Sequence, residues 1–403
     1  MRCKLTGKKI NPFMSFGKMP IANGFLEKKN FSKEFFYEMR VGFSEDFSLF
    51  QLDDHPSPKS MFHNNYPFYT SSSNFMIKHF KKYANWSKKF LGPHSKVIEL
   101  GSNDGTFLKN FTKTNIESVG FEPSKNVHLK AKNQGVLSIN KFFNQKSISL
   151  VKSFYGNTSL ICGANVICHI PDLNELFSCI IKLLNTNGIF VFEEPYLGSV
   201  FQKTSYDQIY DEHIYLFSCV SISKIAEFYD LRLIDAIPQI THGGSMRYVL
   251  ARKESKWKVS KNVDKIMSEE YSFNLDNNQF CKIFRDNCEK SKKNLRKKLI
   301  DLKNNNKKIC GYAATSKSTT ILNYCNIGKD LIDFITDTTP EKIGKFTPGT
   351  HIPVIDHKNF LYNKPDIAVL FAWNHKKEIF LKEKNFKKSG GKWLTFFPNI
   401  KLW

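Results

Sequence analysis

The stretch Lys96-Val97-Ile98-Glu99-Leu100-Gly101-Ser102-Asn103-Asp104-Gly105 decides the fold of this 403-residue chain. Its first half is apolar enough for a buried strand, and its two glycines predict a sharp loop with a helix beginning near Gly105. Further apolar runs lie at residues 118–122, 160–166 and 188–193, with helical patterns between them. Because strands alternate with helices, the sequence predicts a parallel α/β sheet.

The loop after this first strand has the features of a cofactor site. Glu99, Gly101 and Gly105 fit the pattern E-x-G-x-x-x-G, and Glu122 ends the next strand 21 positions after Gly101. Glycine permits close approach to a ligand, a helix N-terminus offers N–H groups, and an acid at this distance can accept both ribose hydroxyls. The third glycine of the pyrophosphate fingerprint is missing, which favours S-adenosylmethionine; a tight turn without a ligand is the alternative. The candidate cofactor-binding residues are Glu99, Gly101, Asn103, Asp104, Gly105, Glu122, Pro123 and Asn165.

The densest group of titratable side chains is the segment Tyr206-Asp207-Gln208-Ile209-Tyr210-Asp211-Glu212-His213. If this segment is helical, Tyr210 and His213 share a face. Imidazole has an ordinary pKa of about 6.5, so His213 is the side chain best matched to proton abstraction at neutral pH. A surface turn that buries a tyrosine is the alternative interpretation.

Two other polar segments are expected at the crevice where the strands of an open α/β sheet end. His169 follows the apolar run at 160–162, although a lone histidine is more often structural than catalytic. Residues 241–247 form a glycine bend whose Arg247 could meet an anion or a polar sugar.

Composition excludes several classes of protein. With 41% hydrophobic and 24% charged residues the chain is neither disordered nor fibrous, and its length predicts two or three domains. The formal net charge is +23, but the lysines are scattered, which favours a solvated basic surface over a nucleic-acid site. No apolar run approaches the roughly 20 residues of a membrane span, and the start lacks a secretory signal, so we expect a cytoplasmic protein. The nine cysteines contain no C-x-x-C pair, and no disulfide is expected.

The second half of the chain repeats the α/β pattern on a smaller scale. Leucines at helical spacing in the polar stretch 253–308 predict a solvated connecting helix, which we favour over a nucleic-acid-binding arm. Strands at 308–312, 331–336 and 367–372, with a helix from Ser318, then predict a smaller nucleotide-fold-like domain.

Taken in order, these motifs resemble those of the S-adenosylmethionine-dependent sugar C-methyltransferases, which act on nucleotide-linked keto-deoxysugars. The resemblance runs nearly end to end. Besides the loop at 99–105 and the segments at 165–172, 210–213 and 242–247, it rests on Pro20-Ile21-Ala22-Asn23-Gly24-Phe25-Leu26, Tyr66-Pro67-Phe68-Tyr69-Thr70-Ser71-Ser72-Ser73, Gly311-Tyr312-Ala313-Ala314-Thr315-Ser316-Lys317, Leu322-Asn323-Tyr324-Cys325 and Ala372-Trp373-Asn374.

The resemblance implies an α/β fold in which a class I methyltransferase domain, which is Rossmann-like, lies between a small N-terminal domain and a second Rossmann-like domain. We expect the small domain at 1–65, the methyltransferase domain at 66–255, a helical linker at 256–308 and the C-terminal domain at 309–403. The implied cofactor is S-adenosylmethionine and the implied substrate a nucleotide-linked sugar. We expect a monomer or weak oligomer without a nucleic-acid or membrane partner.

The reaction implied by the resemblance begins when a base removes the proton next to the sugar ketone, and the enolate then attacks the sulfonium methyl group. By motif position His213 would be that base or its closest partner, and Tyr210, Glu212, His169 and Tyr66 would surround the sugar. Phenol or imidazole donors would stabilise the oxyanion. The candidate substrate-binding residues are Tyr69, Ser72, Ser73, His242, Gly244, Arg247 and Lys317, with the serines at 71–73 and Lys317 as contacts to the diphosphate.

One departure from the family concerns its structural zinc, which four cysteines in two C-x-x-C pairs usually hold. Here Cys3 is followed by Lys4-Leu5-Thr6, and the second pair falls at Ser44 and Phe47. One cysteine cannot build a tetrahedral site, so we expect no zinc. Aromatic packing would have to replace the metal, with the candidates Phe13, Phe16, Phe25, Phe35 and Phe36.

Other functions stay open beside this hypothesis. An O-methyltransferase acting on a sugar or small molecule would use the same cofactor loop. The +23 charge would suit a nucleic-acid-binding or RNA-modifying methyltransferase. The lost zinc ligands would suit a relic of the family that binds a sugar nucleotide without turning it over, although Tyr210, Glu212 and His213 argue against it. The product would serve a surface polysaccharide, a glycolipid or a secondary metabolite.

Overall fold

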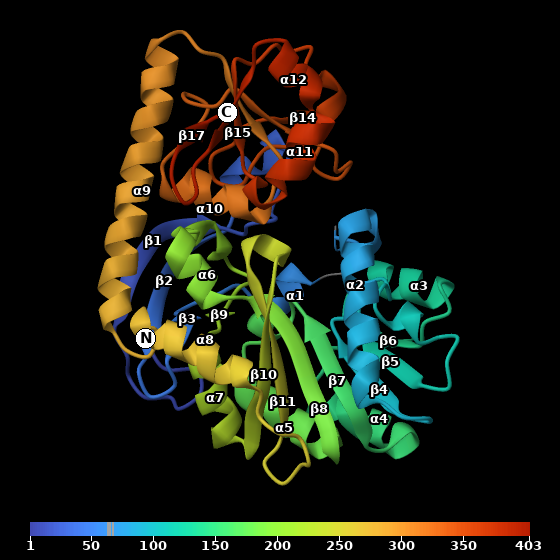
Figure 1. Cartoon of the computed structure of the whole chain (residues 1–403). Coiled ribbons are helices and arrows are strands. Elements are labelled where there is room, and N and C mark those ends of the chain that lie inside the picture. Colours follow the sequence, from blue (N-terminus) through green and yellow to red (C-terminus); the bar gives the residue numbers. More distant parts are fainter. Residues whose placement is uncertain (63–65, 67) are drawn as a thin grey trace.

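The computed structural model describes residues 1–62, 66 and 68–403, so Pro67 of the motif at 66–73 lies outside the described residues. Strands of the described part form three sheets (Figure 1). Helix α9 (Gln279–Asn304) runs along one side of the molecule, beside both the N-terminal sheet and the C-terminal sheet. Within the described ranges, no helix is long and apolar enough to cross a bilayer.

The central sheet contains the stretch at 96–105. Its strands lie in the order β10-β11-β8-β7-β4-β5-β6, and β11 is antiparallel to both of its neighbours while the other pairs are parallel. The bounds are β4 Lys96–Leu100, β5 Glu117–Phe121, β6 Ser138–Ile139, β7 Thr158–Ala164, β8 Leu184–Pro195, β10 Leu231–Gln239 and β11 Ser245–Arg252. The predicted α/β fold is therefore confirmed.

Helices cover both faces of this sheet (Figure 1). Their bounds are α2 Asn74–Ser87, α3 Lys125–Asn133, α4 Gln145–Tyr155, α5 Leu173–Leu183, α6 Leu197–Lys203, α7 Cys219–Phe228 and α8 Lys261–Ser272. Ile98 and Leu100 pack with α4, α5 and α7, whereas Val97 packs with α2 on the other face. Successive side chains of a strand point to opposite faces, so the apolar run at 97–100 serves both layers.

The helix expected to begin near Gly105 is absent, and that expectation was wrong. The chain forms turns and a short 3-10 helix there, Leu108–Asn110. Asn110 Nδ2 donates to the carbonyl oxygens of Thr106 and Phe107, at 3.1 and 2.8 Å. Such side-chain bonds compete with the hydrogen-bond ladder of a helix. The loop therefore presents no helix N-terminus to a ligand.

The N-terminal sheet is completed by a strand from the central part of the chain. Its order is β1-β2-β3-β9, with bounds β1 Pro12–Pro20, β2 Phe36–Ser44, β3 Leu49–Leu52 and β9 Tyr215–Leu216. β9 pairs antiparallel with β3 through Phe50 and Leu216. Since β9 directly follows the acidic segment at 206–213, this pairing ties that segment to the N-terminal domain.

The positions of the family's zinc ligands lie together in the structure. The thiol of Cys3 is in hydrogen-bond contact with the side chains of Ser44 and Thr6. Phe47 joins Cys3 and Leu49 in one buried apolar cluster. A single thiol beside two hydroxyls and an aromatic ring is not a zinc-binding set, because a structural site needs four N or S ligands.

The aromatic packing of this domain differs in part from expectation. Phe16 is buried, and Phe13 and Phe25 pack against the same core. Phe35 and Phe36, in contrast, are 54% and 41% exposed, so their predicted core role was wrong. Phe36 begins β2, whose side chains alternate between core and solvent at that end.

The C-terminal sheet has the order β14-β13-β12-β15-β16-β17. Its strands are β12 Ile309–Tyr312, β13 Phe334–Asp337, β14 Val354–Asp356, β15 Ile367–Leu370, β16 Lys392–Thr395 and β17 Lys401–Leu402. The remaining helices are α1 Pro58–Met61, α10 Ser316–Tyr324, α11 Lys376–Lys382 and α12 Lys384–Lys388. All pairs except β16 with β17 are parallel, as the second α/β pattern in the sequence predicts.

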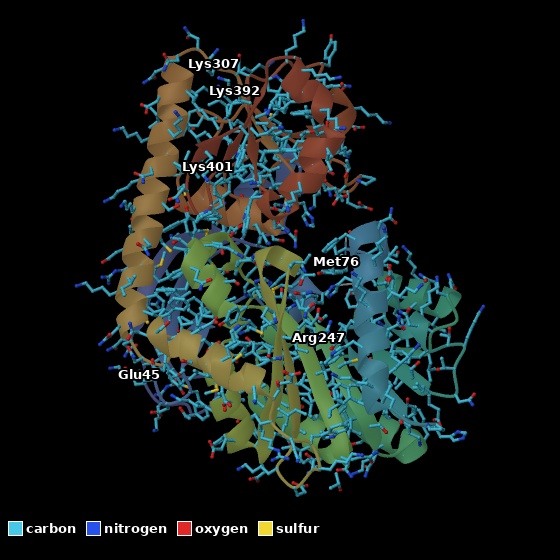
Figure 2. The ribbon with its side chains drawn as sticks, in the orientation of Figure 1. Glu45, Met76, Arg247, Lys307, Lys392 and Lys401 are labelled. Carbon is cyan, nitrogen blue, oxygen red and sulfur yellow. The ribbon has the colours of Figure 1, made fainter. Side chains whose placement is uncertain are left out.

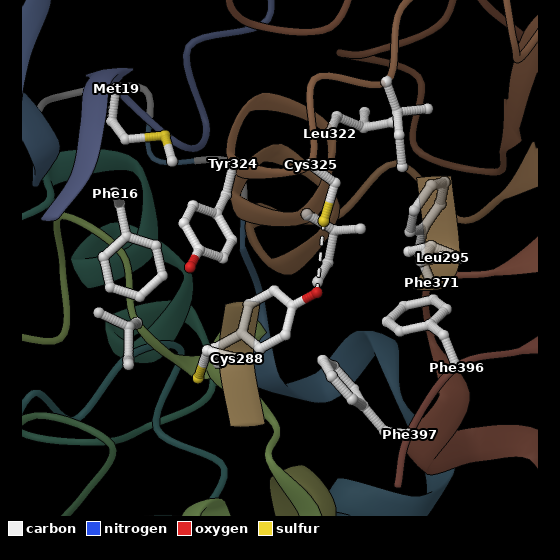
Figure 3. Packing of buried hydrophobic residues seen from close by; sticks show 14 of the residues in the cluster. Phe16, Met19, Cys288, Leu295, Leu322, Tyr324, Cys325, Phe371, Phe396 and Phe397 are labelled. Carbon is white, nitrogen blue, oxygen red and sulfur yellow. Dashed lines mark hydrogen bonds between the residues drawn. The ribbon is translucent and has the colours of Figure 1, made fainter. Parts of the chain in front are cut away.

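One hydrophobic core joins the N-terminal and C-terminal domains (Figure 3). Phe16 of β1 lies against Tyr324 of α10, with ring centroids 4.8 Å apart. Cys288 of α9 belongs to the same cluster, as do Phe396 and Phe397 beyond β16. Because close-packed interiors resist relative movement, this shared core holds the two outer domains in one arrangement.

The N-terminal domain should hold no structural zinc, for the ligand-count reason given above. We expect that wild type and Cys3→Ala have the same zinc content and the same change of Tm on dialysis against EDTA, because no metal contributes to the folding free energy of this domain. Thermal unfolding with parallel elemental analysis measures both quantities. A zinc ion whose removal lowers the Tm, and which the variant Cys3→Ala also loses, would contradict this prediction.

Candidate active site

A cavity of about 1010 Å³ lies where the three domains meet. Asn23 of the N-terminal domain, His213 of the central domain and Lys317 of the C-terminal domain all contribute to its wall. Every candidate residue from the sequence lines it except Ser71, Ser73, Asp104, Gly105, Gly244 and Arg247. The cofactor, acid–base and substrate candidates therefore share one space.

The cofactor loop has a backbone that requires glycine at its start. Gly101 has a φ of +61°, and a Cβ there would lie 2.7 Å from the Val166 side chain. Glu122 accepts hydrogen bonds from the backbone N–H groups of Asn103 and Ser124, at 3.1 and 2.7 Å. These bonds hold the glutamate at the cavity wall beside the loop. Burial raises its pKa.

Two polar atoms beside this loop are buried without a hydrogen-bond partner. They are Oε2 of Glu99 and Oδ1 of Asn165, and both residues line the cavity. Burial raises the pKa of Glu99 well above its ordinary value, and the carboxyls of Asp104 and Glu122 add to the effect. Unpaired acceptors in a buried wall call for ligand donors, which the ammonium and ribose hydroxyls of S-adenosylmethionine supply. The residues present therefore fit this cofactor.

Asp104 and Gly105 support the loop from outside the cavity. Asp104 accepts the Ser71 backbone N–H at 3.0 Å and the Thr106 hydroxyl at 2.7 Å. A Cβ on Gly105, whose φ is +79°, would lie 2.8 Å from Val136. Asp104 thereby draws the segment that contains Tyr69 and Ser72, both in the cavity wall, over the cofactor loop.

The acid–base group is built around the imidazole of His213. Its Nδ1 lies 2.6 Å from the carbonyl oxygen of Gln208, and its Nε2 lies 2.9 Å from the Tyr210 hydroxyl. A carbonyl oxygen only accepts, so Nδ1 carries the proton and Nε2 accepts from Tyr210. Burial lowers the pKa of His213 well below its ordinary value of 6.5. The ring is thus neutral, and its Nε2 lone pair is engaged by the Tyr210 hydroxyl in the cavity wall.

His169 stacks on this ring, with centroids 5.3 Å apart. Its Nε2 is buried without a partner, and burial lowers its pKa to about 3. Phe62 stacks on its other side at 5.5 Å and also contacts Tyr66. Two neutral imidazoles and two phenols, those of Tyr66 and Tyr210, therefore surround one part of the cavity.

Tyr210 and His213 contact each other across a turn. The sequence analysis considered a helix for residues 206–213, and that possibility was wrong. Only Tyr206–Gln208 forms a short 3-10 helix. The following turn is held from outside by the N-terminal domain: Asn23 Nδ2 donates to Glu212 Oε1 at 2.8 Å. The Asp211 carboxylate accepts the Ala22 N–H at 3.0 Å. Burial raises the pKa of both carboxyls, that of Asp211 to about 8.

The glycine bend at 241–247 divides between cavity and core. His242 lines the cavity with an unpartnered Nε2, and burial lowers its pKa to about 3. Arg247, labelled in Figure 2, is instead buried between the central sheet and α2. Its Nε lies 2.6 Å from Glu193 of β8, and its guanidinium lies 4.2 Å from the ring centroid of Tyr83 in α2. Gly244, with a φ of +133°, would place a Cβ 2.4 Å from Ser199. The expectation that Arg247 and Gly244 meet the substrate thus has no support in this geometry.

Lysines of the C-terminal domain complete the wall, and sequence reasoning found only one of them. Lys317 Nζ donates to the carbonyl oxygen of His242 at 3.3 Å, and Lys342 Nζ donates to that of Ala314 at 2.8 Å. Burial lowers the pKa of both ammonium groups. Lys342 follows β13, and its position after a parallel strand was the signal that could have identified it.

Ser73 has a local structural role. Its hydroxyl accepts the backbone N–H of Met76 at 3.3 Å and so caps α2. Asp207, which was not a candidate, accepts the Trp373 indole N–H at 2.7 Å across the boundary between the central and C-terminal domains. These contacts shape the wall without entering the cavity.

Loss of the Glu122 carboxylate should weaken cofactor binding. We expect Glu122→Ala to lose about 1.5 to 3 kcal/mol of S-adenosylmethionine binding, since hydrogen bonds to a charged acceptor disappear. Glu122→Gln keeps an acceptor and should lose less. Calorimetric Kd values decide the matter, and an unchanged affinity in Glu122→Ala would place the cofactor elsewhere.

Comparison with known proteins gives family matches along most of the chain. Residues 3–62 match a putative zinc binding domain, residues 74–236 a methyltransferase domain and residues 240–398 a C-methyltransferase C-terminal domain. The C-methyltransferase NovU of Streptomyces niveus is 28% identical over 392 residues, which cover 96% of this chain and 93% of that protein. Although residues 3–62 match a zinc-binding domain, Cys3 is the one thiol that remains at the four ligand positions. The absence of zinc therefore stays a prediction.

Two solved structures illustrate weaker matches to part of the chain. The magnesium protoporphyrin IX methyltransferase of Synechocystis PCC 6803 with bound S-adenosylmethionine is 10% identical, with a TM-score of 0.33, over 44% of this chain and 78% of that chain. The N-methyltransferase NodS of Bradyrhizobium japonicum WM9 is 12% identical, with a TM-score of 0.34, over 45% and 98%. On the family matches, the chain belongs to the S-adenosylmethionine-dependent C-methyltransferases with a zinc-binding-type N-terminal domain, a methyltransferase domain and a C-methyltransferase C-terminal domain.

Proposed function

We propose that the protein methylates carbon in a nucleotide-linked keto-deoxysugar, through an enolate formed by proton abstraction next to the ketone. The observation that carries this proposal is the neutral His213 imidazole, which lines the same cavity as the cofactor loop and has its Nε2 bonded to the Tyr210 hydroxyl. A carbon acceptor needs a base and an oxyanion site, and both kinds of group are present. S-adenosylmethionine supplies the electrophilic methyl group when bound.

The bond between His213 and Tyr210 couples the base to an oxyanion donor. While Nε2 is unprotonated it accepts the Tyr210 O–H, at 2.9 Å. Nε2 has one lone pair, so the Tyr210 O–H turns away from it before Nε2 takes the carbon-bound proton. The Tyr210 O–H is then free to donate to the enolate oxygen, where developing charge is best stabilised. The same movement frees the base and supplies the oxyanion with a donor.

The carbonyl of Gln208 stabilises the protonated base. It accepts from Nδ1 at 2.6 Å in the neutral ring, and the same bond strengthens when the ring is an imidazolium. His169 and Tyr66 stand on the same wall and are proposed as further donors to the sugar. Glu212 is the proposed acceptor for a sugar hydroxyl, because its second oxygen is not used by Asn23.

The C-terminal domain is proposed to hold the nucleotide diphosphate. Lys317, which is buried, and Lys342, which is half-buried, place ammonium groups in the cavity wall, and each donates to a backbone carbonyl. Ammonium groups suit phosphate oxygens as point charges. Ser72 and Tyr69, from the segment over the cofactor loop, line the opposite part of the cavity.

Product analysis tests this function against its nearest chemical rival. Incubation with S-adenosylmethionine and a panel of nucleotide-linked 4-keto sugars, followed by mass spectrometry, identifies the acceptor. NMR then separates a new C-methyl branch from an O-methyl ether. An O-methyl product would replace the enolate mechanism with simple deprotonation of a hydroxyl.

Replacement of His213 should affect the chemical step. His213→Asn keeps the approximate size but removes the proton affinity, so kcat should fall by roughly 10² to 10⁴ with little change in cofactor affinity. Solvent deuterium gives a second measure: wild type should wash deuterium into the carbon beside the ketone, and the variant should not. Near-normal turnover and exchange in His213→Asn would move the base to His169 or Tyr66.

The pH dependence follows from the lowered pKa of His213. Since burial disfavours the imidazolium, the free base persists below the ordinary value of 6.5 and is lost only at still lower pH. We expect kcat/KM for the sugar to stay within about twofold between pH 7.5 and pH 6, whereas an exposed imidazole would be mostly protonated at the lower value. An acid limb with its midpoint at or above the ordinary value would show that His213 is not buried as a neutral base.

A further inference from the structure

A second kind of site overlaps the acid–base group. One ligand atom each of Cys168, His169 and His213 lies within 4.8 Å of the other two, and all three side chains are buried. Thiolate and imidazole are the donors that zinc and similar cations prefer. In the part of the chain that the structure describes, no other set of three cysteine, histidine or acidic side chains converges in this way.

The surroundings of this group favour a cation. The carboxyl of Glu194 is in hydrogen-bond contact with the Cys168 thiol, and Glu212 also interacts with that thiol through its charge. Glu194 is buried beside the group, where it accepts the backbone N–H groups of Val166 and Ile167 at 3.0 and 2.6 Å. A dication in this pocket would therefore meet compensating negative charge and a partner that orients its sulfur ligand.

Two of the three ligands are also accessible. One of them, His169, has a free nitrogen, whereas a metal at His213 Nε2 would displace the Tyr210 O–H from it. His169 and His213 line the cavity, so an ion can reach them without passing through the core. His169 Nε2 has no partner. The bond from His213 Nδ1 to the Gln208 carbonyl fixes that ring with Nε2 towards the cavity, which is how proteins orient histidine ligands.

We propose that Cys168, His169 and His213 form an inhibitory site for a thiophilic divalent cation such as Zn²⁺. On binding, the Cys168 thiol releases its proton to solvent, its sulfur bonds to the metal, and each imidazole donates one nitrogen lone pair. One proton leaves for each ion bound. The metal site rests on geometry alone. Its inhibitory effect rests on the proposed function, because the ion would occupy the lone pair of His213 that removes the proton.

The experiment uses the full chain after chelator treatment and desalting, with Co²⁺ as the spectroscopic probe. We expect one Co²⁺ per chain with a thiolate-to-cobalt charge-transfer band in the ultraviolet. Cys168→Ala should abolish that band and weaken binding by more than about 100-fold, since a direct ligand is lost. Cys3→Ala is the matched control and should keep both. S-adenosylmethionine affinity, which should be the same in all three proteins, verifies that Cys168→Ala is folded.

Activity gives the second readout. Zn²⁺ should inhibit methyl transfer by wild type and Cys3→Ala, with recovery on adding EDTA, whereas Cys168→Ala should stay active at the same Zn²⁺ concentration. A band that survives in Cys168→Ala, or no band in wild type, would overturn the site. A band that behaves as expected without any inhibition would uphold the site and instead overturn the assignment of His213 as the base.

Discussion

The segment at 206–213 is buried but has almost no regular secondary structure, and the rest of the active site depends on how its polar groups are satisfied. Buried backbone and carboxyl groups need partners, which a helix or sheet would otherwise supply. Here the partners come from other domains. Asp211 accepts the Ala22 N–H, and the Ile209 carbonyl accepts the Thr320 hydroxyl of α10 at 2.9 Å. The turn that contains His213 is therefore held by hydrogen bonds from both outer domains.

The same requirement explains why the outer domains share a core. Thr319 of α10 donates to the carbonyl oxygen of Ala22 at 2.8 Å, so the two domains that hold the turn also hold each other. Phe16 and Tyr324 then pack at that junction (Figure 3). A junction that moved would leave buried carboxyls unpaired, at a cost of about 1 to 3 kcal/mol for each lost partner. Rigid assembly of three domains is thus a condition for placing one imidazole.

Local patterns in the sequence were enough for the strands of the two α/β sheets and for most residues of the cavity, because parallel strands end at one edge. Local patterns failed where a hydrogen bond or a contact with another part of the chain determines the structure. A helix was predicted to begin near Gly105, but the Asn110 side chain bonds to the backbone there. Arg247 lies at the predicted crevice in sequence, yet Glu193 and Tyr83 hold it in the core. Lys342 lies in the loop after β13, a position at the predicted crevice that the sequence analysis did not consider.

Burial acts on the acids and the bases of this cavity in opposite directions. It raises the pKa of Glu99 well above its ordinary value and lowers that of His169 to about 3, so the wall tends towards neutral groups although the chain carries a net charge of +23. A neutral, buried imidazole is always ready to accept a proton, but its low proton affinity makes it a weak base. Such a base can remove a proton from carbon only if an adjacent carbonyl acidifies the C–H bond and hydrogen-bond donors are already positioned for the oxyanion. The electrostatics of the cavity therefore favour a ketone substrate more strongly than the presence of His213 alone does.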